Sequence, residues 1–576
     1  MEHNTVIPWL EWNEAAFDRA KRENKPILLD ISAVWCHWCH RLDKDTYAVP
    51  DIAEYVTANF VPIRVDTDKR PDINRRYNLG GWPTTAFLTP DGVPIGGGTY
   101  FPPEQMRQLL RDVKSSWQKT QNQPVPTPPP EHATKLGELS EDIVDEILGE
   151  VANNFDPIYG GFGSQPKFPQ TEAQELALMK YYYTGNHEIL RIATVTLNNA
   201  GRSGTYDKEM GGFFRYSTTR DWSVPHFEKM CEDNAKWLQL YLHAYQITGD
   251  TFYSDIAKGI IEYVNNWLSD RDQGCFYGSQ DADEEYYSLD KANRLGKPAP
   301  YIDKHIYTNW NAIMISSYLD ASYVLDNPAA KESALRSVQR LISLNSREGE
   351  GMYHFYDGQP NLENQLIDQM QTANTLIHAY ELTGDKNFLN RAVGLVNFST
   401  RLRDPQAGGF YDTPPDVNAP GFLRQPIKAL DDNTVAARAL VKLYHLTLDS
   451  TYLKMAEESL RCFAETYLSF GFMSADYALA VDAFLHDPTV IRIVGSRKED
   501  RTVQLLGEAA RIYDPRKVIQ ILDPETDASE IQREGFSSQS TPNAYVCVGK
   551  ACTAPISEPG EIPAAVKQMV AAQFRK

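Results

Sequence analysis

Pro26-Ile-Leu-Leu-Asp-Ile-Ser-Ala-Val-Trp-Cys-His-Trp-Cys-His40 joins a short apolar run, typical of a buried strand, to a Cys-x-x-Cys pair that opens a predicted helix. A helix N-terminus favours the thiolate form of a cysteine, because free N–H groups and the helix dipole stabilise negative charge. His37, between the two cysteines, adds to this effect when it is protonated. We therefore predict a redox pair in which Cys36 is the exposed nucleophile and Cys39 the resolving thiol.

Three other interpretations of this pair remain open. Cys-x-x-Cys-His is also the attachment motif of c-type haem, which needs an exporting compartment, yet the N-terminal residues have no basic region followed by an apolar run. A zinc site needs further ligands at suitable spacing, and no Cys or His nearby supplies them. A redox-inactive domain used for docking is the third alternative. We expect no metal and no cofactor.

The segments that follow predict a small α/β domain over residues 1–122. Residues 60–65 and 84–88 form further apolar runs, the turn Pro90-Asp91-Gly92 leads to an antiparallel return at 94–98, and residues 103–117 have the pattern of an amphipathic helix. A proline-rich spacer then predicts a linker at 123–135.

Residues 136–487 contain long helical stretches that are joined by two alternating types of connection. The first is a turn at a helix end, with copies at Tyr181-x-x-Thr-Gly-Asn186, Tyr245-x-x-Thr-Gly-Asp250, Tyr380-x-x-Thr-Gly-Asp385 and Tyr444-x-x-Thr-Leu-Asp449, and a degenerate copy at Tyr323-x-x-Asp-Asn327. The second is a Gly-aromatic loop, with copies beginning at Gly160, Gly211, Gly274, Gly351, Gly408 and Gly471. This repeat predicts six helical hairpins, arranged as a closed (α/α)6 toroid or as an open solenoid.

Successive connections in an up-down helical array lie at opposite ends. We therefore predict that the Thr-Gly-Asp turns share one face of the toroid and that the Gly-aromatic loops rim a central pit on the other. Residues 488–576 contain short strand patterns and predict a small C-terminal α/β segment, in which Cys547 and Cys552 are expected as free thiols.

Composition excludes several functions. The chain of 576 residues has a net charge of −20, which disfavours nucleic acid as a partner because phosphate backbones need Lys and Arg. We find no apolar run of membrane-spanning length, so we expect no membrane insertion. Seven cysteines and no secretory signal indicate a cytoplasmic protein without a disulfide scaffold.

The first domain resembles thioredoxins. Asp30 lies six residues before Cys36, where thioredoxins keep a buried acid that assists the resolving cysteine, and Trp82-Pro83 matches their cis-proline segment. In place of the lysine that thioredoxins keep near the buried acid, this chain is predicted to have Pro62. Asp30 and Pro83 therefore join Cys36 and Cys39 as candidate catalytic residues.

A wider set of motifs resembles the spermatogenesis-associated protein 20 family. It includes Trp35-Cys-His-Trp-Cys-His40, Phe87-Leu-Thr-Pro-Asp-Gly92, Pro225-His-Phe-Glu-Lys-Met230 and Gln280-Asp-Ala-Asp283, and it spans nearly the whole chain. The resemblance implies a thioredoxin-like domain followed by a toroid similar to N-acylglucosamine 2-epimerases and six-hairpin glycosidases.

Counting back twelve residues from the five repeat tyrosines gives an Asp or Asn in four repeats and Pro169 in the first. Twelve helical residues span about 18 Å, so these groups are predicted at the pit end of their helices. They are either N-caps or a polar ring around the pit. The four residues are Asp233, Asn311, Asp368 and Asp432.

His226, Glu228, Asp281 and Asp283 lie in the predicted rim loops. Sugar-processing enzymes need paired acids or an acid–base pair, which these residues could supply, whereas the alternative is a structural polar network. We therefore hold three hypotheses: a thiol–disulfide oxidoreductase with a protein thiol partner, a carbohydrate-active enzyme with a saccharide in the pit, and a non-enzymatic scaffold.

Overall fold

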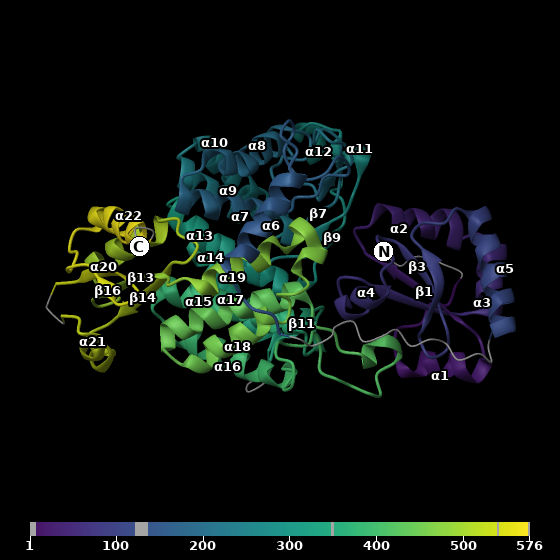
Figure 1. Cartoon of the computed structure of the whole chain (residues 1–576). Helices are drawn as coiled ribbons and strands as arrows, with labels where there is room; N and C mark the ends of the chain where they lie inside the picture. Colours follow the sequence, from purple (N-terminus) through teal and green to yellow (C-terminus); the bar gives the residue numbers. More distant parts are fainter. Residues whose placement is uncertain (1–6, 121–135, 347–350, 538–540, 574–576) are drawn as a thin grey trace. The chain divides into compact units, whose positions relative to one another are not determined.

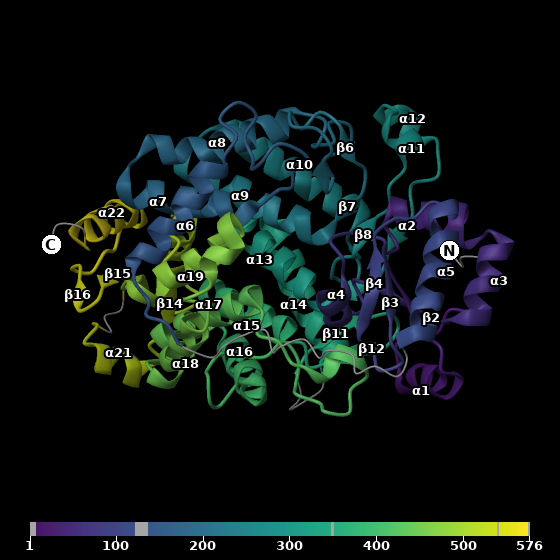
Figure 2. The same ribbon diagram turned by 45° about the vertical axis from the view of Figure 1, so that its right-hand side comes forward.

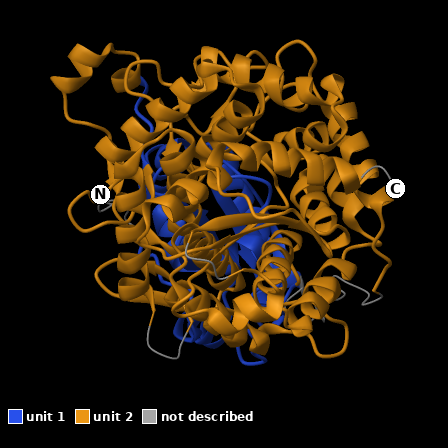
Figure 3. Ribbon diagram, turned by 90° about the vertical axis from the view of Figure 1, so that its left-hand side faces the viewer, with its two compact units in different colours: residues 1–133, 280–284, 411–427 blue, residues 134–279, 285–410, 428–576 orange. Residues whose placement is uncertain are grey.

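The computed structural model describes residues 7–120, 136–346, 351–537 and 541–573. The chain forms two compact units (Figure 3). The predicted linker at 123–135 lies outside the described residues. The units are assembled from several stretches of chain: unit 1 from 1–133, 280–284 and 411–427, and unit 2 from 134–279, 285–410 and 428–576. Two short segments of the predicted toroid region thus fold with unit 1, and residues 488–576 are not a unit of their own.

A four-stranded sheet in the order β2-β1-β3-β4 forms the centre of unit 1 (Figure 1). β1 (Ile27–Ser32) runs parallel to β2 (Val61–Asp66) and antiparallel to β3 (Thr84–Leu88), and β3 pairs with the antiparallel β4 (Pro94–Gly98). Helices join the parallel pair, as a parallel connection requires, and the predicted turn joins β3 to β4. The thioredoxin-like fold predicted for this unit is confirmed.

Side-chain alternation along β1 divides the core of unit 1 into two clusters. Ile27, Leu29 and Ile31 pack in a cluster with residues of α1 and α4, whereas Leu28 packs in another with residues of α3 and α5. Asp30 lies on the same face of the sheet as Leu28, because it is two residues further along the strand. The helical elements of this unit are α1 (Glu14–Glu23), α2 (His37–Leu42), the π-helical η1 (Asp43–Tyr47), α3 (Pro50–Asn59), α4 (Pro71–Tyr77) and α5 (Pro103–Thr120).

The segment 411–427 packs against α4 within unit 1. The Arg76 guanidinium donates to both carboxylate oxygens of Asp412 at 2.6 and 3.0 Å, and both side chains are only 3% exposed. Tyr77 stacks on Phe422 of this segment, with ring centroids 5.5 Å apart, and its hydroxyl accepts the Phe422 N–H. A buried, bidentate ion pair of this kind fixes the segment in one position. The segment contains the 3-10 helix η3 (Gly421–Arg424).

Within the described residues, six helical hairpins form the main part of unit 2. The inner helices contact one another in chain order, and the last of them, α19, contacts the first, α7, so the ring is closed. The (α/α)6 toroid is therefore confirmed and the open solenoid is excluded. The inner helices are α7 (Thr171–Thr184), α9 (Cys231–Thr248), α13 (Thr308–Val324), α15 (Leu366–Thr383), α17 (Leu430–Thr447) and α19 (Ala475–Leu485). The outer helices are α6 (Glu141–Asn154), α8 (His187–Arg202), α10 (Thr251–Trp267), α14 (Pro328–Asn345), α16 (Lys386–Ser399) and α18 (Ser450–Arg461).

The Thr-Gly-Asp turns have a simple physical basis. In the turn after α9, Gly249 ends the helix in the left-handed conformation, at φ 70°, which glycine adopts without steric cost. Asp250 then caps α10 by accepting the Phe252 N–H at 3.0 Å. One short turn therefore stops one helix and starts the next.

The loops at the opposite ends carry short elements. Several pair as small sheets, β7-β8-β9 and β10-β11-β12 among them. The elements are β5 (Tyr216–Ser217), β6 (Pro225–His226), β7 (Lys229–Met230), β8 (Ser279–Gln280), α11 (Glu284–Tyr287), α12 (Lys291–Leu295), β9 (Ile302–Asp303), β10 (Ile306–Tyr307), β11 (Tyr353–Tyr356), β12 (Pro360–Glu363) and the 3-10 helix η2 (Thr400–Leu402).

The C-terminal segment repeats the topology of unit 1. Its strand order is β14-β13-β15-β16, with one parallel pair followed by two antiparallel pairs. The loop after β13, equivalent to the Cys-x-x-Cys loop, is Gly495-Ser-Arg-Lys-Glu499 and contains no cysteine. The segment is therefore a second thioredoxin-like arrangement without the redox motif. Its elements are β13 (Thr489–Val494), α20 (Asp500–Arg511), β14 (Val518–Leu522), α21 (Ala528–Glu534), β15 (Asn543–Val548), β16 (Ala551–Cys552), the 3-10 helix η5 (Pro559–Glu561) and α22 (Ile562–Gln573).

This segment packs on the Thr-Gly-Asp end of the toroid. β14 contacts α15 and α17 (Figure 2). In the same segment, α20 contacts α13. The Arg516 guanidinium donates twice to Asp482 of α19, at 2.7 Å each, and both side chains are buried. The segment therefore covers the end of the ring opposite to the Gly-aromatic loops.

Cys547 and Cys552 form a disulfide in the structure, so the prediction that they are free thiols is wrong. The register of the β15–β16 hairpin places the two residues directly opposite each other, with Cα atoms 4.1 Å apart. Sequence spacing alone does not define this register.

Among the described residues, one segment, Tyr467–Leu485, is long and apolar enough to cross a membrane, which corrects the expectation that the chain has no such run. It consists of the 3-10 helix η4 (Tyr467–Ser474) and α19, and Gly471 inside η4 has non-helical backbone angles. Because α19 packs against α6, α7 and α17, the segment belongs to the core of the toroid.

Candidate functional site

The Cys36–Cys39 pair forms a disulfide at the start of α2. Cys36 is the N-cap, and its Sγ accepts the Cys39 N–H at 3.1 Å, so a free donor of the helix N-terminus is directed at this sulfur. Cys36 and Cys39 are only 3% and 2% exposed, however, and the exposed side chain of the motif is Trp38, at 46%. The expectation that Cys36 is exposed is therefore wrong for the disulfide form.

Arg64, and not Pro62, lies beside the buried acid. The β1–β2 register pairs Asp30 with Arg64 and places Pro62 opposite Leu28, which corrects the sequence prediction. The Arg64 Nε donates to Asp30 at 2.6 Å, and its terminal nitrogens donate to Asp43. A guanidinium can serve two carboxylates at once because it has five N–H donors in a planar fork.

Burial raises the pKa of Asp30 from 3.8 to about 6, although the nearby charge of Arg64 opposes the rise. The side chain is 1% exposed, and its Oδ1 has no hydrogen-bond partner among the described residues. Asp30 is therefore ionised at neutral pH with one oxygen available, as a proton acceptor must be.

The cis-proline segment is linked to the cysteine motif by two tryptophans. The Trp82–Pro83 peptide bond is cis, as the resemblance to thioredoxins implied. The rings of Trp35 and Trp82 meet edge to face with centroids 5.8 Å apart, and the Trp35 Nε1 donates to Asp68 at 2.6 Å. The residues preceding Cys36 and Pro83 therefore contact each other.

Asp281 lies beside the cysteine motif within unit 1. Its carboxylate is 3.8 Å from the Nδ1 of His40, which follows Cys39 directly, and Asp281 is buried. Asp283, two residues later, is exposed. Both belong to the segment 280–284, so unit 1 and not the toroid contains these two predicted pit residues.

Within unit 2, His226 and Glu228 form a close pair. The His226 Nδ1 is 2.5 Å from a carboxylate oxygen of Glu228, which is 1% exposed. The His226 ring stacks on Tyr216 at 4.9 Å, and Tyr216 stacks on Phe168 at 4.7 Å. An acid–base pair thus adjoins a row of aromatic rings that ends in Phe168, which is 39% exposed.

Three of the four predicted ring residues share one position in their helices and the fourth is shifted by one residue, whereas their grouping around a pit stays a prediction. Asp233, Asp368 and Asp432 are each the third residue of their helix, whereas Asn311 is the fourth and Trp310 takes the third place. α13 ends without a Thr-Gly turn, so a count back from Tyr323 slips by one residue. Asn311 instead exchanges hydrogen bonds with the backbone of Phe276.

The three aspartates are not N-caps, so the capping interpretation is wrong. The N-cap positions are Met230, Gln365 and Ala429. Asp368 pairs with the Nδ1 of His354 at 2.8 Å, and burial raises the pKa of Asp368 even though His354 opposes the rise. Burial likewise raises the pKa of Asp233 to about 7.

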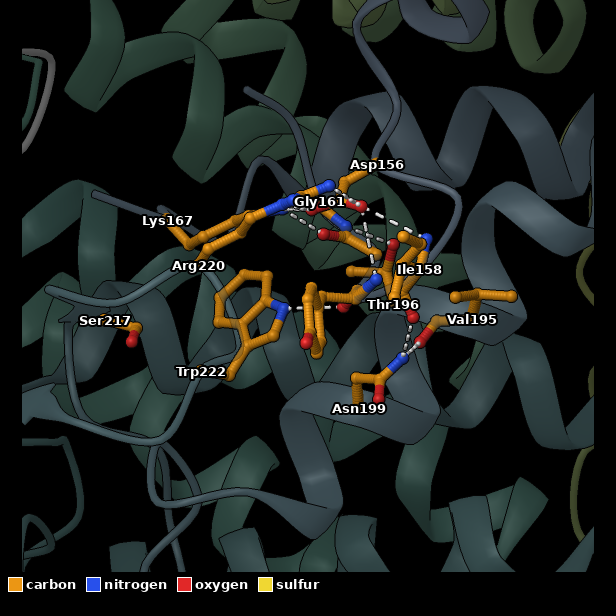
Figure 4. Close-up of polar contacts among 12 residues, drawn as sticks. Asp156, Ile158, Gly161, Lys167, Val195, Thr196, Asn199, Ser217, Arg220 and Trp222 are labelled. Carbon is orange, nitrogen blue, oxygen red and sulfur yellow. Dashed lines mark hydrogen bonds and ion pairs between the residues drawn. The ribbon is translucent and has the colours of Figure 1, made fainter. Parts of the chain in front are cut away.

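Sequence reasoning missed an aspartate that begins most of the Gly-aromatic loops. The Asp156 carboxylate accepts hydrogen bonds from the Lys167 ammonium at 2.8 Å and from the Arg220 guanidinium at 2.7 Å (Figure 4). Equivalent buried pairs join Asp207 to Lys229 and Asp404 to Lys428. The spacing Asp-x-x-x-Gly would have identified these aspartates. We call each buried pair a lysine latch.

Among the described residues, no group of three or more His, Cys, Asp and Glu is placed to hold a metal ion. The chemistry that these residues support is thiol exchange at Cys36 and Cys39 and proton transfer at the His–carboxylate pairs.

Fold and site together define a class of protein, in which a thioredoxin-like domain with a Cys-x-x-Cys disulfide shares one chain with an (α/α)6 toroid. Residues 1–127 match the family model described as Thioredox_DsbH, protein of unknown function, DUF255. Spermatogenesis-associated protein 20 of Homo sapiens is 26% identical over 708 residues, covering 96% of this chain and 89% of the relative. The resemblance to that family is therefore confirmed over nearly the whole chain.

Two further similarities concern parts of the chain. Thioredoxin H2 of Arabidopsis thaliana is 31% identical over 72 residues, which are 12% of this chain and 51% of that protein. The solved structure of cellobiose 2-epimerase from Spirochaeta thermophila DSM 6192 aligns with a TM-score of 0.48 at 15% identity, over 66% of this chain and 100% of that one.

Proposed function

We propose that the protein is a cytoplasmic thiol–disulfide oxidoreductase acting through Cys36 and Cys39. The observation that carries this proposal is the Cys36–Cys39 disulfide at the N-terminus of α2, with the Cys39 N–H directed at the Cys36 sulfur. In the reduced protein, the Cys36 thiolate attacks a disulfide of the partner, forms a mixed disulfide and expels one partner thiolate. Cys39 then gives its proton to Asp30 and attacks the Cys36 sulfur. The second partner sulfur leaves as a thiolate, and two electrons have passed from the cysteine pair to the partner.

The test is reduction of insulin disulfides with dithiothreitol as the recycling reductant. The full chain should accelerate insulin precipitation well above the rate with dithiothreitol alone. Equal rates with and without the protein, over a tenfold range of protein concentration, would contradict the proposal.

The pH dependence of the resolving step provides a second prediction. Asp30 accepts a proton only when ionised, and its pKa is about 6, so the rate should fall as the pH decreases through about 6. Asp30→Asn should slow the step and remove this inflection. Stopped-flow measurement of release from a mixed disulfide, between pH 5 and 8, tests both expectations.

The matched control for that experiment is Asp18→Asn, which removes an exposed carboxylate of α1. This variant should keep the inflection and the rate. An inflection that survives in Asp30→Asn would assign the titration to another group.

A second candidate function is acid–base chemistry on a carbohydrate in unit 2. The observation that favours it is the His226–Glu228 pair next to the stacked rings of Tyr216 and Phe168. An imidazole held by a carboxylate can remove and return a proton, and a flat row of aromatic rings suits a sugar ring.

This second function predicts epimerisation or hydrolysis of a neutral sugar that depends on Glu228. Glu228→Gln should lower the rate at least about a hundredfold, the usual contribution of general acid–base catalysis. The control is Glu175→Gln, because Glu175 pairs with His243 at 2.9 Å elsewhere on the inner helices. Proton NMR of a sugar panel in D2O measures both exchange and turnover; equal rates in the two variants would rule the pair out.

A further inference from the structure

The four aspartates that begin Gly-aromatic loops hold the backbone in the same way. Each carbonyl accepts the N–H of the glycine four residues later, at 2.7–3.1 Å, and each N–H donates to the carbonyl of the residue after that glycine, at 2.9–3.1 Å. The four residues are Asp156, Asp207, Asp270 and Asp404. The loop backbone therefore does not explain why the side chains of these four aspartates have different partners.

Asp270 differs from the other three because it has no lysine latch. Its Oδ1 accepts the Gln273 N–H at 3.0 Å, and within the described parts of the chain no cation lies within ion-pair distance of its carboxylate. Lys304 lies four residues before α13, as Lys167 lies four residues before α7. Lys167 is fully buried in its latch, whereas Lys304 is exposed, with its ammonium 5.7 Å from the centre of the Tyr277 ring.

A cavity of about 350 Å³ is lined by both halves of this open latch. Its other walls come from α14, through Arg340, and from the β11–β12 hairpin, through Tyr356. Tyr301, at 43% exposure, also lines it. A volume of this size is at the lower end of small-molecule sites, which are about 300–1,000 Å³.

The cavity lining includes several polar groups. They are the hydroxyls of Tyr277 and Tyr356 and the carboxylate of Asp270, whose Oδ1 accepts a hydrogen bond from the Gln273 N–H. In the three closed latches, by contrast, the corresponding charges satisfy each other. Polar groups placed around a partly enclosed site favour a ligand that supplies donors and acceptors.

The charges of the cavity select the class of ligand. Asp270 and Asp357 balance Lys304 and Arg340, so neither a strongly anionic nor a strongly cationic ligand is favoured overall. Three tyrosine rings offer electron-rich faces to C–H groups. A neutral, polyhydroxylated ring has both properties, because its hydroxyls pair with the charged groups and its C–H face packs on the rings.

We propose that this cavity is a binding site for a neutral saccharide of one or two pyranose units, formed where the third repeat leaves its lysine latch open. The site does not depend on the Cys36–Cys39 chemistry. The Asp270 carboxylate accepts hydrogen bonds from sugar hydroxyls, and the Lys304 ammonium donates hydrogen bonds to them. The Tyr301 ring packs on the sugar ring.

Saturation-transfer difference NMR on the full chain tests the proposal, with D-glucose, D-mannose, N-acetyl-D-glucosamine and cellobiose as probes. At least one of them should give a saturable signal. Asp270→Asn and Tyr301→Ala should each raise the Kd of the bound sugar at least about tenfold. This is the effect expected for loss of a hydrogen bond to a charged group or of a packed ring. The matched controls are Asp272→Asn, an exposed acid two residues away, and Tyr159→Ala, a half-exposed tyrosine of another loop.

Three results would overturn the proposal: no saturable signal with any of the four sugars, equal affinities in the site and control variants, or binding of inorganic phosphate in preference to the sugars. Binding should be unchanged in Cys36→Ser, so a failed sugar experiment is distinguishable from a failure of the redox function. Unchanged circular dichroism and thermal midpoints confirm that each variant is folded.

Discussion

Replacement of Cys36 by serine is expected to reduce insulin-disulfide reduction to the background rate of dithiothreitol. The attacking thiolate is the only group in the proposed reaction that bonds to the partner, and a serine hydroxyl stays protonated at neutral pH. Cys39→Ser should behave differently. Its Cys36 still attacks, but the mixed disulfide cannot resolve, so a stable adduct with the partner accumulates and is visible by mass spectrometry.

The matched control is Cys462→Ser, which removes a thiol that is free in the structure. Burial raises the pKa of Cys462, so its thiol is a poor nucleophile and the variant should keep full activity. The competing source of activity is the Cys547–Cys552 disulfide, in which Cys552 is exposed. Activity that survives Cys36→Ser and disappears in Cys552→Ser would assign the reaction to that pair and contradict our proposal.

Local signals allowed much of the fold to be predicted from the sequence. The apolar run at 27–31, the cysteine motif and Trp82-Pro83 define a thioredoxin-like domain because each is a short-range pattern. The Thr-Gly-Asp turns identified the helical repeat for the same reason, since Gly249 ends one helix and Asp250 caps the next.

The errors concern contacts that depend on register or on chain path. Arg64 faces Asp30 because of how β1 pairs with β2, and Cys552 faces Cys547 because of a hairpin register, and neither pairing is a local property. Asn311 was misplaced because α13 lacks the Thr-Gly turn from which the count begins. Asp281 could not be assigned to unit 1 because its segment returns there from a loop between α10 and α13.

The lysine latches predict the largest effect on stability. The Asp207 carboxylate accepts hydrogen bonds from the Lys229 ammonium and from the Arg294 guanidinium, each at 2.7 Å. All three side chains are at least 97% buried. Asp207→Asn keeps the side-chain oxygen that accepts the Glu209 N–H but removes the charge. Two buried cations then lack a counter-ion, and breaking a buried pair in this way costs about 3–5 kcal/mol. Urea unfolding of unit 2 should show a correspondingly lower midpoint.

Asp270→Asn is the matched control, because it makes the same chemical change in a loop of the same backbone geometry. Asn can still accept a hydrogen bond from the Gln273 N–H, and no buried cation loses a partner, so the midpoint should change by less than the equivalent of about 1 kcal/mol.

Burial already lowers the pKa of Lys229 to about 8 against the attraction of Asp207. Removing Asp207 should therefore drive Lys229 to its neutral form, and the additional replacement Lys229→Met should recover part of the lost stability. Equal losses in Asp207→Asn and Asp270→Asn would show that the stability resides in the loop backbone rather than in the latch.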